Sequence, residues 1–320
     1  MASATKQALL AALSAAQGEC ISGQQLAQQL GVSRAAVHKA AAALAAQGYA
    51  LEAAPRRGYR LAGGDPFCAE AVGEYDAPIY LYDKLESSNR TAKTLALEGT
   101  PHGTMVLTSQ QTAGRGRMGR SFESPEGLGL YLSVLWRPEG TPEDLLPLTP
   151  MAAVSAAGAI RRVTGAPVRI KWPNDLVLEG RKLAGILTEA SLSGRGVDYV
   201  VIGIGVNLRQ RPDDFSPEVA RIATSLEAQG YPADRAALET ALAEALCQAF
   251  GHLHTPAVYA ADYRRLCLNL GQTLRIPDTG ETVTALDIDR QYGLVVRRRD
   301  GTVDTLRCGE VSVRGLYGYV

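Results

Sequence analysis

The chain has 320 residues, 46% of them hydrophobic, and its 33 lysine and arginine residues balance 33 aspartate and glutamate residues. This length and composition suffice for two or three domains, and the zero net charge excludes nucleic-acid binding through the overall field of the protein, so any such binding requires a local basic patch. Five scattered cysteines without a C-x-x-C pair, together with the lack of any apolar run of roughly 18 residues, predict a cytoplasmic protein with reduced thiols, no zinc site and no membrane or signal segment.

Residues 1–62 have the pattern of a winged helix-turn-helix domain. A capping box at Ser22 precedes a short helix, Gly31 ends that helix, and Ser33 caps the next one. Two short β-like runs after Gly48 form the wing. The alternative is a small helical dimerisation module whose arginines only keep the surface soluble and whose His38 makes no contact. Because cations gather where DNA would lie, we expect DNA contacts from Ser33, Arg34, His38, Lys39, Arg56 and Arg57.

Gly63–Pro66 is the expected linker to a second domain, residues 67–268. Residues 79–82 predict a strand, and Ser87–Asn89 predict a polar cap for a helix that continues to about residue 99. The segment that comes next along the chain, 104–108, predicts another strand. Further predicted elements are a strand at 128–135, a helix at 147–164, strands at 181–189 and 200–207, and two helical stretches within 234–266.

The segment Gln110–Arg120, called the Gly/Arg loop below, contains three glycines and three arginines. Glycines let the backbone approach a ligand closely, and planar arginine side chains match carboxylate and phosphate oxygens, so the segment is typical of an anion-binding loop. Its G-x-G-x-x-G pattern also fits a dinucleotide-binding fingerprint, but a proline and a glycine follow where that fingerprint requires a helix. The remaining alternatives are a solvated loop and an electrostatic contact with nucleic acid.

Two further segments place polar groups at the ends of predicted strands. In Lys171–Asp175, a proline turn presents an amide and a carboxylate. After a predicted hairpin at Glu179–Gly180, Lys182 enters a largely apolar strand, although an edge-strand lysine that reaches solvent explains this position as well. The alternating glycines of 200–207 lower strand stability, but they allow a flat ligand to lie against the backbone.

Together these segments resemble the biotin protein ligases, and they follow the order and spacing of that family. With the winged helix and a closing segment at Gly309–Arg314, the chain resembles the bifunctional biotin ligase and biotin operon repressor family over essentially its whole length. The resemblance implies an α+β fold: a winged helix-turn-helix domain, a central α/β biotin/lipoate ligase-type catalytic domain with a mixed sheet, and a C-terminal SH3-like β-barrel at residues 269–320. The segments that carry it are Ser87–Asn89, Gln111–Arg120, Lys171–Leu176, Arg181–Leu187 and Gly203–Asn207.

The resemblance also implies a two-step reaction. Biotin is activated by ATP, with Mg²⁺ as counter-ion of the phosphates, to biotinyl-5′-AMP, and is then transferred to a lysine of a biotin carboxyl carrier protein. It implies no tightly bound cofactor and no dedicated protein cage for the metal. The residues implied to act in catalysis are Lys182, Arg117, Arg115, Asp175, Asn174 and Lys171. The implied biotin-binding residues are Ser87, Ser88, Asn89, Gln111, Gly114, Arg115, Gly116, Arg117, Lys182, Gly185, Leu187, Gly203 and Ile204, and the implied nucleotide-binding residues are Phe122, Asn207 and Arg314.

Biotinyl-AMP is further implied to act as corepressor, so that the adenylate-bound homodimer binds operator DNA. Three positions depart from the usual family residues: Ser88, Met118 and Phe122 replace a threonine, an arginine and a tryptophan. We expect these changes to alter affinity rather than the reaction.

Two other classes of function share features with this sequence. A DNA-binding sensor that binds biotin without catalysis is disfavoured because Lys182, Asp175, Arg115 and Arg117 are all present. A lipoate-type ligase, which shares the core fold, is disfavoured by the winged helix and the Gly/Arg loop.

Overall fold

The computed structural model describes residues 2–16, 18–46, 48–54, 58–64, 75–194, 196–277, 279–307, 314–315 and 319. The chain divides into two compact units, residues 1–74 with 234–237 and residues 75–233 with 238–320. Within the described part of the chain, no helix is both long and apolar enough to cross a membrane.

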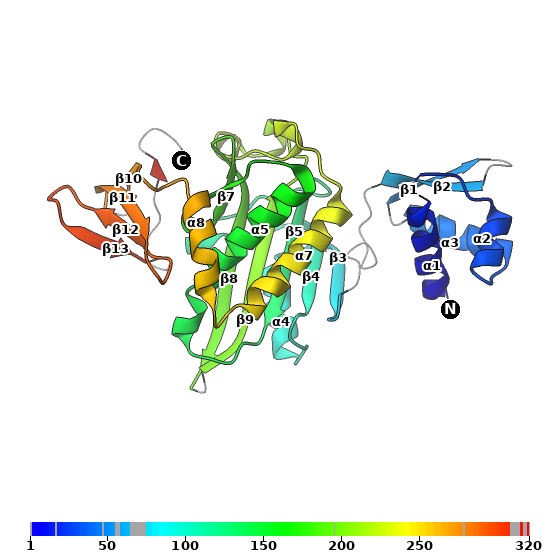
Figure 1. The fold of residues 1–320 in the computed structure, drawn as a ribbon, viewed down its shortest axis with the longest axis horizontal. Helices are drawn as coiled ribbons and strands as arrows, with labels where there is room; N and C mark the ends of the chain where they lie inside the picture. The colour runs from blue at the N-terminus through cyan, green and yellow to red at the C-terminus, as the bar shows by residue number, and fades with distance from the viewer. Residues whose placement is uncertain are drawn as a thin grey trace. The chain divides into compact units, whose positions relative to one another are not determined.

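The described part of the first unit consists of three helices followed by an antiparallel hairpin (Figure 1). The predicted capping box is present, because the Ser22 side chain accepts a hydrogen bond from N of Gln25 and the Gln25 side chain accepts one from N of Ser22, both over 3.1 Å. Ser33 caps the third helix through a 3.1 Å hydrogen bond from N of Ala36. The elements are α1 (Ala2–Ala15), α2 (Gly23–Gln29), α3 (Arg34–Ala46), β1 (Tyr49–Ala54) and β2 (Gly58–Gly64).

A seven-stranded mixed sheet forms the centre of the second unit, with the strand order β3-β4-β5-β9-β8-β7-β6 (Figure 1). Only β3 and β4 pair in parallel. Glu179 and Gly180 form the predicted hairpin turn, and both have the positive φ angles, 48° and 73°, that a tight two-residue turn needs. The strands are β3 (Ile79–Leu85), β4 (Met105–Gln111), β5 (Gly129–Trp136), β6 (Arg169–Lys171), β7 (Asp175–Leu178), β8 (Arg181–Ser193) and β9 (Gly196–Asn207).

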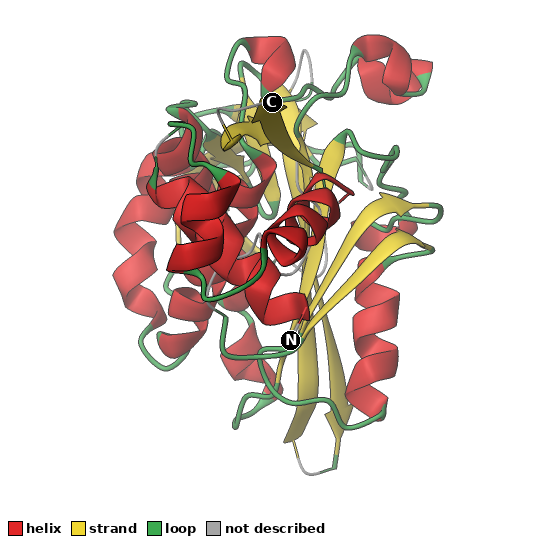
Figure 2. Ribbon diagram, turned by 90° about the vertical axis from the view of Figure 1, so that its right-hand side faces the viewer, coloured by secondary structure: helices red, strands yellow, loops and turns green. Residues whose placement is uncertain are grey.

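Helices cover both faces of this sheet (Figure 2). On one face, α4 buries Ala92 and Ala96 against Val201 of β9. On the other face, the Thr149 hydroxyl of α5 donates a hydrogen bond to the Thr188 hydroxyl of β8 over 2.7 Å. Side chains alternate along a strand, so the neighbours of Thr188 point to the α4 face. The helices are α4 (Ser88–Leu97), α5 (Leu148–Thr164), α6 (Pro217–Ala220), α7 (Arg235–Gly251) and α8 (Ala260–Leu266), with short 3-10 turns at Arg117–Gly119, Pro142–Leu145, Pro212–Asp214, Glu227–Gln229 and Pro256–Tyr259.

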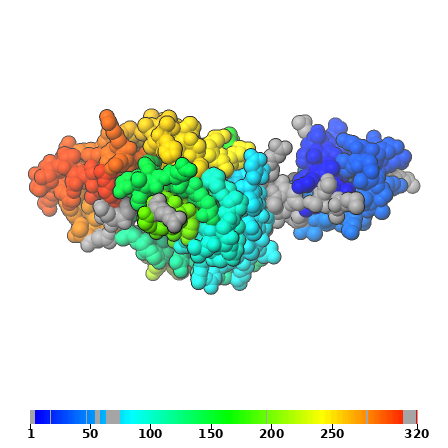
Figure 3. All heavy atoms as spheres, turned by 90° about the horizontal axis from the view of Figure 1, so that it is seen from below, coloured from blue at the N-terminus to red at the C-terminus, as the bar shows by residue number. Residues whose placement is uncertain are grey.

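After α8 the chain forms a five-stranded antiparallel sheet in the order β13-β12-β11-β10-β14. Its orange and red surface adjoins the yellow and green surface of the same unit (Figure 3). N of Trp172 donates a hydrogen bond to Oδ1 of Asn269 over 2.6 Å, and Nε1 of Trp172 donates one to O of Tyr292 over 3.0 Å. The described residues confirm a small antiparallel sheet here, and the SH3-like barrel stays a prediction. The strands are β10 (Thr273–Arg275), β11 (Thr282–Ile288), β12 (Leu294–Arg297), β13 (Val303–Leu306) and β14 (Arg314–Gly315).

The predicted helices and strands are confirmed, with differences at their ends. Ser87 occupies the N-cap position of α4, but its side chain makes no capping hydrogen bond; N of Ser88 instead donates to Oε1 of Gln111 over 2.8 Å. Gly63 and Gly64, expected in the linker, belong to β2, because Gly64 pairs with Tyr49 across the hairpin.

Candidate active site

Two rows of residues cross the α4 face of the large sheet. Cross-strand partners share a face, and residues two apart on a strand lie about 7 Å from each other, so the two rows run side by side. Motifs that are far apart in the sequence are thereby brought together. The first row consists of Ser133, Gly203 and Leu187, and the second consists of Tyr131, Gly205, Gly185, Asp175 and Lys171.

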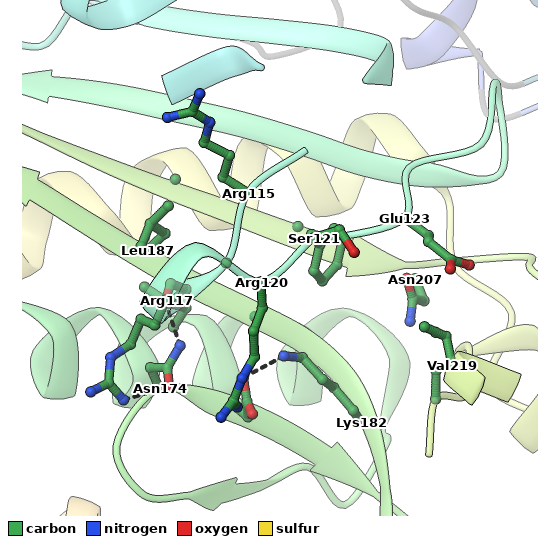
Figure 4. A pocket seen from close by; sticks show the side chains of 18 of the residues that line it. Arg115, Arg117, Arg120, Ser121, Glu123, Asn174, Lys182, Leu187, Asn207 and Val219 are labelled. Carbon is green, nitrogen blue, oxygen red and sulfur yellow. Dashed lines mark hydrogen bonds and ion pairs between the residues drawn. The ribbon is translucent and has the colours of Figure 1, made fainter. Parts of the chain in front are cut away.

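A cavity of about 810 Å³ lies over these rows. Its walls come from the Gln111–Glu123 loop, the start of α4, the Lys171–Asp175 turn and the segment Phe215–Ala223. In Figure 4, Leu187, Arg117 and Asn174 lie on one side, whereas Glu123, Asn207 and Val219 lie on the other, with Arg120 and Lys182 between them. The cavity therefore has two ends with a cationic middle.

Two positions on the cavity floor require glycine. A Cβ atom on Gly203 would lie 2.0 Å from Oδ1 of Asn89, and one on Gly205 would lie 2.5 Å from a ring carbon of Phe122. Both distances are well inside van der Waals contact, so a larger residue must displace those side chains. The glycines thus let Asn89 and the Phe122 ring pack directly on the sheet, and a flat ligand against this backbone stays a prediction.

A buried hydrogen-bond network closes the Leu187 end. Nδ2 of Asn89 donates to Oε2 of Glu189 over 2.9 Å, and Oδ1 of Asn89 accepts from the Ser133 hydroxyl over 2.6 Å. These bonds fix the orientation of the Asn89 amide. Nζ of Lys93 lies 2.6 Å from the other oxygen of Glu189. Burial raises the pKa of the Glu189 carboxyl, but Lys93, Asn89 and the charge of Arg115 together hold it below its usual value, so Glu189 is an anionic acceptor at neutral pH.

The Gly/Arg loop is closed by its own backbone. N of Gly116 donates to O of Arg120 over 2.7 Å, and N of Phe122 donates to O of Gly114 over 2.9 Å. Gly114 is packed too tightly for a side chain, since a Cβ there would lie 2.3 Å from O of Phe122. Met118 lies in the left-handed region at φ 56° and is 52% exposed. The loop is thus an ordered hairpin-like turn.

The arginines of this loop point in different directions. Nη1 of Arg117 donates a hydrogen bond to Oδ1 of Asn174 over 3.4 Å. Figure 4 shows Arg120 and Lys182 converging on the same space, whereas Arg115 points away from them. All four cations line the cavity, and together they favour an anionic ligand.

Lys182 reaches the cavity because of a β-bulge. Asp175 of β7 pairs with Gly185, yet Val177 pairs with Lys182, so β8 has one extra residue between these pairs. With regular alternation, Lys182 and Gly185 would point to opposite faces. The bulge turns the Lys182 side chain to the same face as Asp175, as bulges beside active sites commonly do.

The Lys182 ammonium forms an ion pair with Asp175. Nζ lies 2.7 Å from Oδ1 of Asp175, at angles outside those of a hydrogen bond. The Tyr319 hydroxyl donates a hydrogen bond to Oδ2 of the same carboxylate. Burial raises the pKa of the Asp175 carboxyl, but Lys182, the Tyr319 hydroxyl and the charge of Lys171 hold it below its usual value. Asp175 is therefore anionic at neutral pH.

The segment Phe215–Ala223, which has no recognisable sequence motif, forms the remaining wall of the cavity. N of Lys182 donates to O of Ile222 over 2.7 Å, and N of Thr224 donates to O of Lys182 over 2.9 Å. Oε2 of Glu123 also accepts a hydrogen bond from N of Ser216 over 2.9 Å. These bonds join the segment to both β8 and the Gly/Arg loop, and they place its apolar side chains in the cavity.

Known protein families and proteins are similar to this chain. The biotin/lipoate A/B protein ligase family matches residues 82–207, and a helix-turn-helix domain family matches residues 5–60. The chain is 40% identical over 247 residues to the bifunctional ligase/repressor BirA of Bacillus subtilis, covering 74% of this chain and 75% of that protein. It is 32% identical over 308 residues to BirA of Escherichia coli K12, covering 93% and 94%. This chain belongs to the bifunctional ligase/repressor family.

A solved structure of a biotin protein ligase is also similar to this chain. The biotin protein ligase from Aquifex aeolicus in complex with biotin and ATP matches with a TM-score of 0.63 and 26% identity, covering 74% of this chain and 99% of that one. The resemblance read from the sequence motifs is thus confirmed at the level of the family.

In this bifunctional ligase/repressor, the predicted site residues gather in one cavity. All six residues predicted for catalysis line it, as do Phe122, Asn207 and every predicted biotin contact except Gly114. The side chain of Arg314 and the whole of Arg56 and Arg57 lie outside the described residues. In the part of the chain that the structure describes, no group of three or more His, Cys, Asp or Glu residues is placed to hold a metal ion. The predicted DNA contacts Ser33, Arg34, His38 and Lys39 are all exposed.

Sequence reasoning missed several residues that line the ligase cavity. Arg120 carried a signal, because it is the third arginine of the Gly/Arg loop. The segment Phe215–Ala223 carried none, since its apolar residues have no distinctive spacing, and Tyr319 carried none either. Both reach the cavity through contacts with residues distant in the sequence.

Proposed function

We propose that this protein activates biotin with ATP to biotinyl-5′-AMP and transfers the biotinyl group to a lysine of a biotin carboxyl carrier protein. The observation that carries the proposal is the order of residues along one face of β9. Gly203, Gly205 and Asn207 follow one another on the cavity face at about 7 Å intervals. Gly203 lies against Asn89 of the polar network. Gly205 lies against the Phe122 ring and pairs with Gly185, which adjoins Lys182, and Asn207 bonds O of Thr224, the residue that follows the Phe215–Ala223 wall. This order matches the biotin ring, the acyl phosphate and the adenine of the adenylate.

The Leu187 end suits biotin. Polar groups from Ser87–Asn89 and Gln111 face the urea of the bicyclic ring, and Leu187 contacts its apolar part and the valeryl chain. Ile204 lines the cavity through its backbone, because its side chain alternates to the opposite face of the sheet. At the opposite end, the Phe122 ring and the Asn207 amide, with the Arg314 side chain, contact the adenine. Gly116 and Gly185, which line the cavity, let the backbone approach the ligand, whereas Gly114 acts by closing the loop against Phe122.

The cationic middle carries the activation step. The biotin carboxylate attacks the α-phosphorus of Mg-ATP, and pyrophosphate leaves. Lys182 and Arg120, which converge there (Figure 4), neutralise the charge that grows on the phosphate oxygens, which is the largest effect a preorganised site supplies. Arg115 and Arg117 line the same cavity and turn toward the bound carboxylate and phosphate. Lys182 breaks its ion pair with Asp175 and pairs with the incoming phosphate instead. Magnesium would be held mainly by the ATP phosphates and water and would neutralise part of the phosphate charge.

The Lys171–Asp175 hairpin carries the transfer step. The lysine of the carrier protein attacks the acyl carbon of the adenylate, and AMP leaves. Asp175, anionic and beside the cationic middle, accepts the proton or orients the amine, while Asn174 and Lys171 hold the amine and the leaving phosphate.

The decisive experiment incubates the protein with labelled biotin, ATP, magnesium and a carrier domain. Label on the carrier, dependent on ATP, supports the proposal, and label on neither carrier nor AMP overturns it.

Arg117→Gly should uncouple adenylate synthesis from its retention. The variant loses the 3.4 Å contact that ties the Gly/Arg loop to Asn174, so biotinyl-AMP escapes and labels bystander lysines. We expect bystander labelling to rise at least about tenfold, as follows from the loss of one charged hydrogen bond. Arg290→Gly, which removes an exposed turn arginine, is the matched control. Bystander labelling at the wild-type level by an active Arg117→Gly protein would show that Arg117 has another role.

The same protein acts as a biotin-responsive repressor. A homodimer formed on binding biotinyl-AMP presents two winged helices to a palindromic operator, with Ser33, Arg34, His38, Lys39, Arg56 and Arg57 against DNA. The exposed N-terminal end of α3 supports this assignment. The first domain, predicted as residues 1–62, extends to Gly64 at the end of β2. The other proposed domains are residues 67–268 and 269–320, the last an SH3-like barrel, and the proposed place of action is the cytoplasm.

Arg34→Ala should weaken operator binding roughly tenfold or more, the usual cost of a lost arginine contact to DNA. Ligase activity should be unchanged, because Arg34 belongs to the first unit.

Sedimentation and gel-shift on the wild-type protein test whether ligand binding, dimerisation and operator binding are linked. Biotin with ATP should raise the dimer fraction and the operator affinity together, and biotin alone should do so less. A monomer under saturating biotin and ATP would overturn the repressor mechanism.

A further inference from the structure

Tyr319 contacts both charged ends of the Lys171–Asp175 hairpin. Its hydroxyl donates to Oδ2 of Asp175, and Nζ of Lys171 lies 3.5 Å from the centre of its ring. Tyr319 also lines the cavity. It lies 144 residues from Asp175 in the sequence, so no local pattern predicts these contacts.

Both contacts of Tyr319 are made with charged side chains that are largely shielded from solvent. Lys171 is only 5% exposed, and an aromatic ring within about 6 Å is an attractive neighbour for a desolvated ammonium. The Asp175 side chain is 17% exposed, and its Oδ1 is already taken by Lys182. Tyr319 therefore holds the second oxygen of Asp175 while its ring keeps Lys171 beside it.

The turn between these two charges is held from the opposite side. Trp172 is bonded to Asn269 and Tyr292, and the Tyr263 hydroxyl donates to O of Pro173 over 3.2 Å. The backbone of the turn is thus fixed without Tyr319. What Tyr319 adds is the orientation of the two side chains, because Asp175 is otherwise free to rotate both oxygens toward Lys182 and Lys171.

We propose that Tyr319 is a positioning residue for the transfer step, which keeps the Asp175 carboxylate aimed at the acceptor amine and apart from Lys171. The inference rests on the proposed function, in which Asp175 orients that amine. It concerns a residue outside every motif that carries the family resemblance. The phenol hydroxyl acts on Asp175 and the ring acts on Lys171, so the two contributions are separable by substitution.

Tyr319→Phe removes the hydroxyl and keeps the ring. In single-turnover experiments, transfer from preformed biotinyl-AMP to a carrier domain should slow about tenfold or more, the usual effect of one hydrogen bond to a charged group. Pyrophosphate release on adenylate formation should change less than about threefold, because Lys182 and the arginines remain. Tyr319→Leu should slow transfer further, since it also removes the ring from Lys171. Tyr80→Phe, on β3, is the matched control.

A double-mutant cycle with Asp175→Asn decides whether Tyr319 acts through Asp175. In the Asp175→Asn background, Tyr319→Phe should have no further effect on transfer, because residues that act as one unit are not additive. Equal loss in both half-reactions, additive effects in the cycle, or a wild-type transfer rate in Tyr319→Phe would each overturn the inference and leave the proposed function intact. Wild-type protein that releases no pyrophosphate with biotin and ATP would instead overturn the proposed function.

Discussion

Lys182→Ala is expected to lower the rate of biotinyl-AMP formation roughly a hundredfold to a thousandfold, the range seen when one transition-state charge contact is removed. The bulge in β8 aims this lysine at the centre of the cavity. Arg120 converges on the same space (Figure 4), but it comes from the loop and does not replace an ammonium held by a sheet. The measurement is pyrophosphate release in a single turnover.

The design must separate chemistry from folding, because the substitution leaves Asp175 without its ion pair. Breaking such a pair destabilises a protein mainly through the charge left behind. The double variant Lys182→Ala, Asp175→Asn removes both charges and should regain stability without regaining adenylate formation. Lys84→Ala, an exposed lysine on β3, should behave like the wild type. An unchanged burst of pyrophosphate from Lys182→Ala would contradict the assignment.

Gly203→Ala should weaken biotin binding about a hundredfold, which corresponds to two steps of about 1.4 kcal/mol. The new Cβ atom would lie 2.0 Å from Oδ1 of Asn89 and 2.9 Å from its Cγ. Asn89 must therefore leave its place between Glu189 and Ser133, and the polar end of the cavity loses its preset geometry. Titration calorimetry with biotin alone measures the effect directly.

Substitutions at two other glycines serve as controls for Gly203→Ala. Gly158→Ala in α5 meets no atom within 4 Å, and it should leave binding unchanged while stabilising the helix by about 0.5–1 kcal/mol. Gly205→Ala displaces the Phe122 ring instead of Asn89, so it should weaken nucleotide binding more than biotin binding. If Gly203→Ala binds biotin as the wild type does, biotin does not occupy the Asn89 end.

Features that depend on near neighbours were predictable from the sequence. The Ser22 capping box and the Glu179–Gly180 turn both formed as expected. In each case the deciding interactions span a few residues: a side chain bonds a backbone group three residues away, or glycine permits a positive φ. The family motifs also named most residues of the cavity, because each motif is a short local segment.

The tertiary structure decided which of these segments meet and which way their side chains point. Alternation along β8 predicts that Lys182 and Gly185 face opposite sides, and only the pairing with β7 reveals the bulge that puts them on one face. The Phe215–Ala223 wall exists because Lys182 pairs with Ile222 and Thr224, and Tyr319 enters because Asp175 accepts its hydroxyl. Such contacts join residues distant in the chain. These contacts form because the rest of the fold leaves particular backbone groups and buried charges in need of a partner. No local pattern in the sequence shows which groups those are.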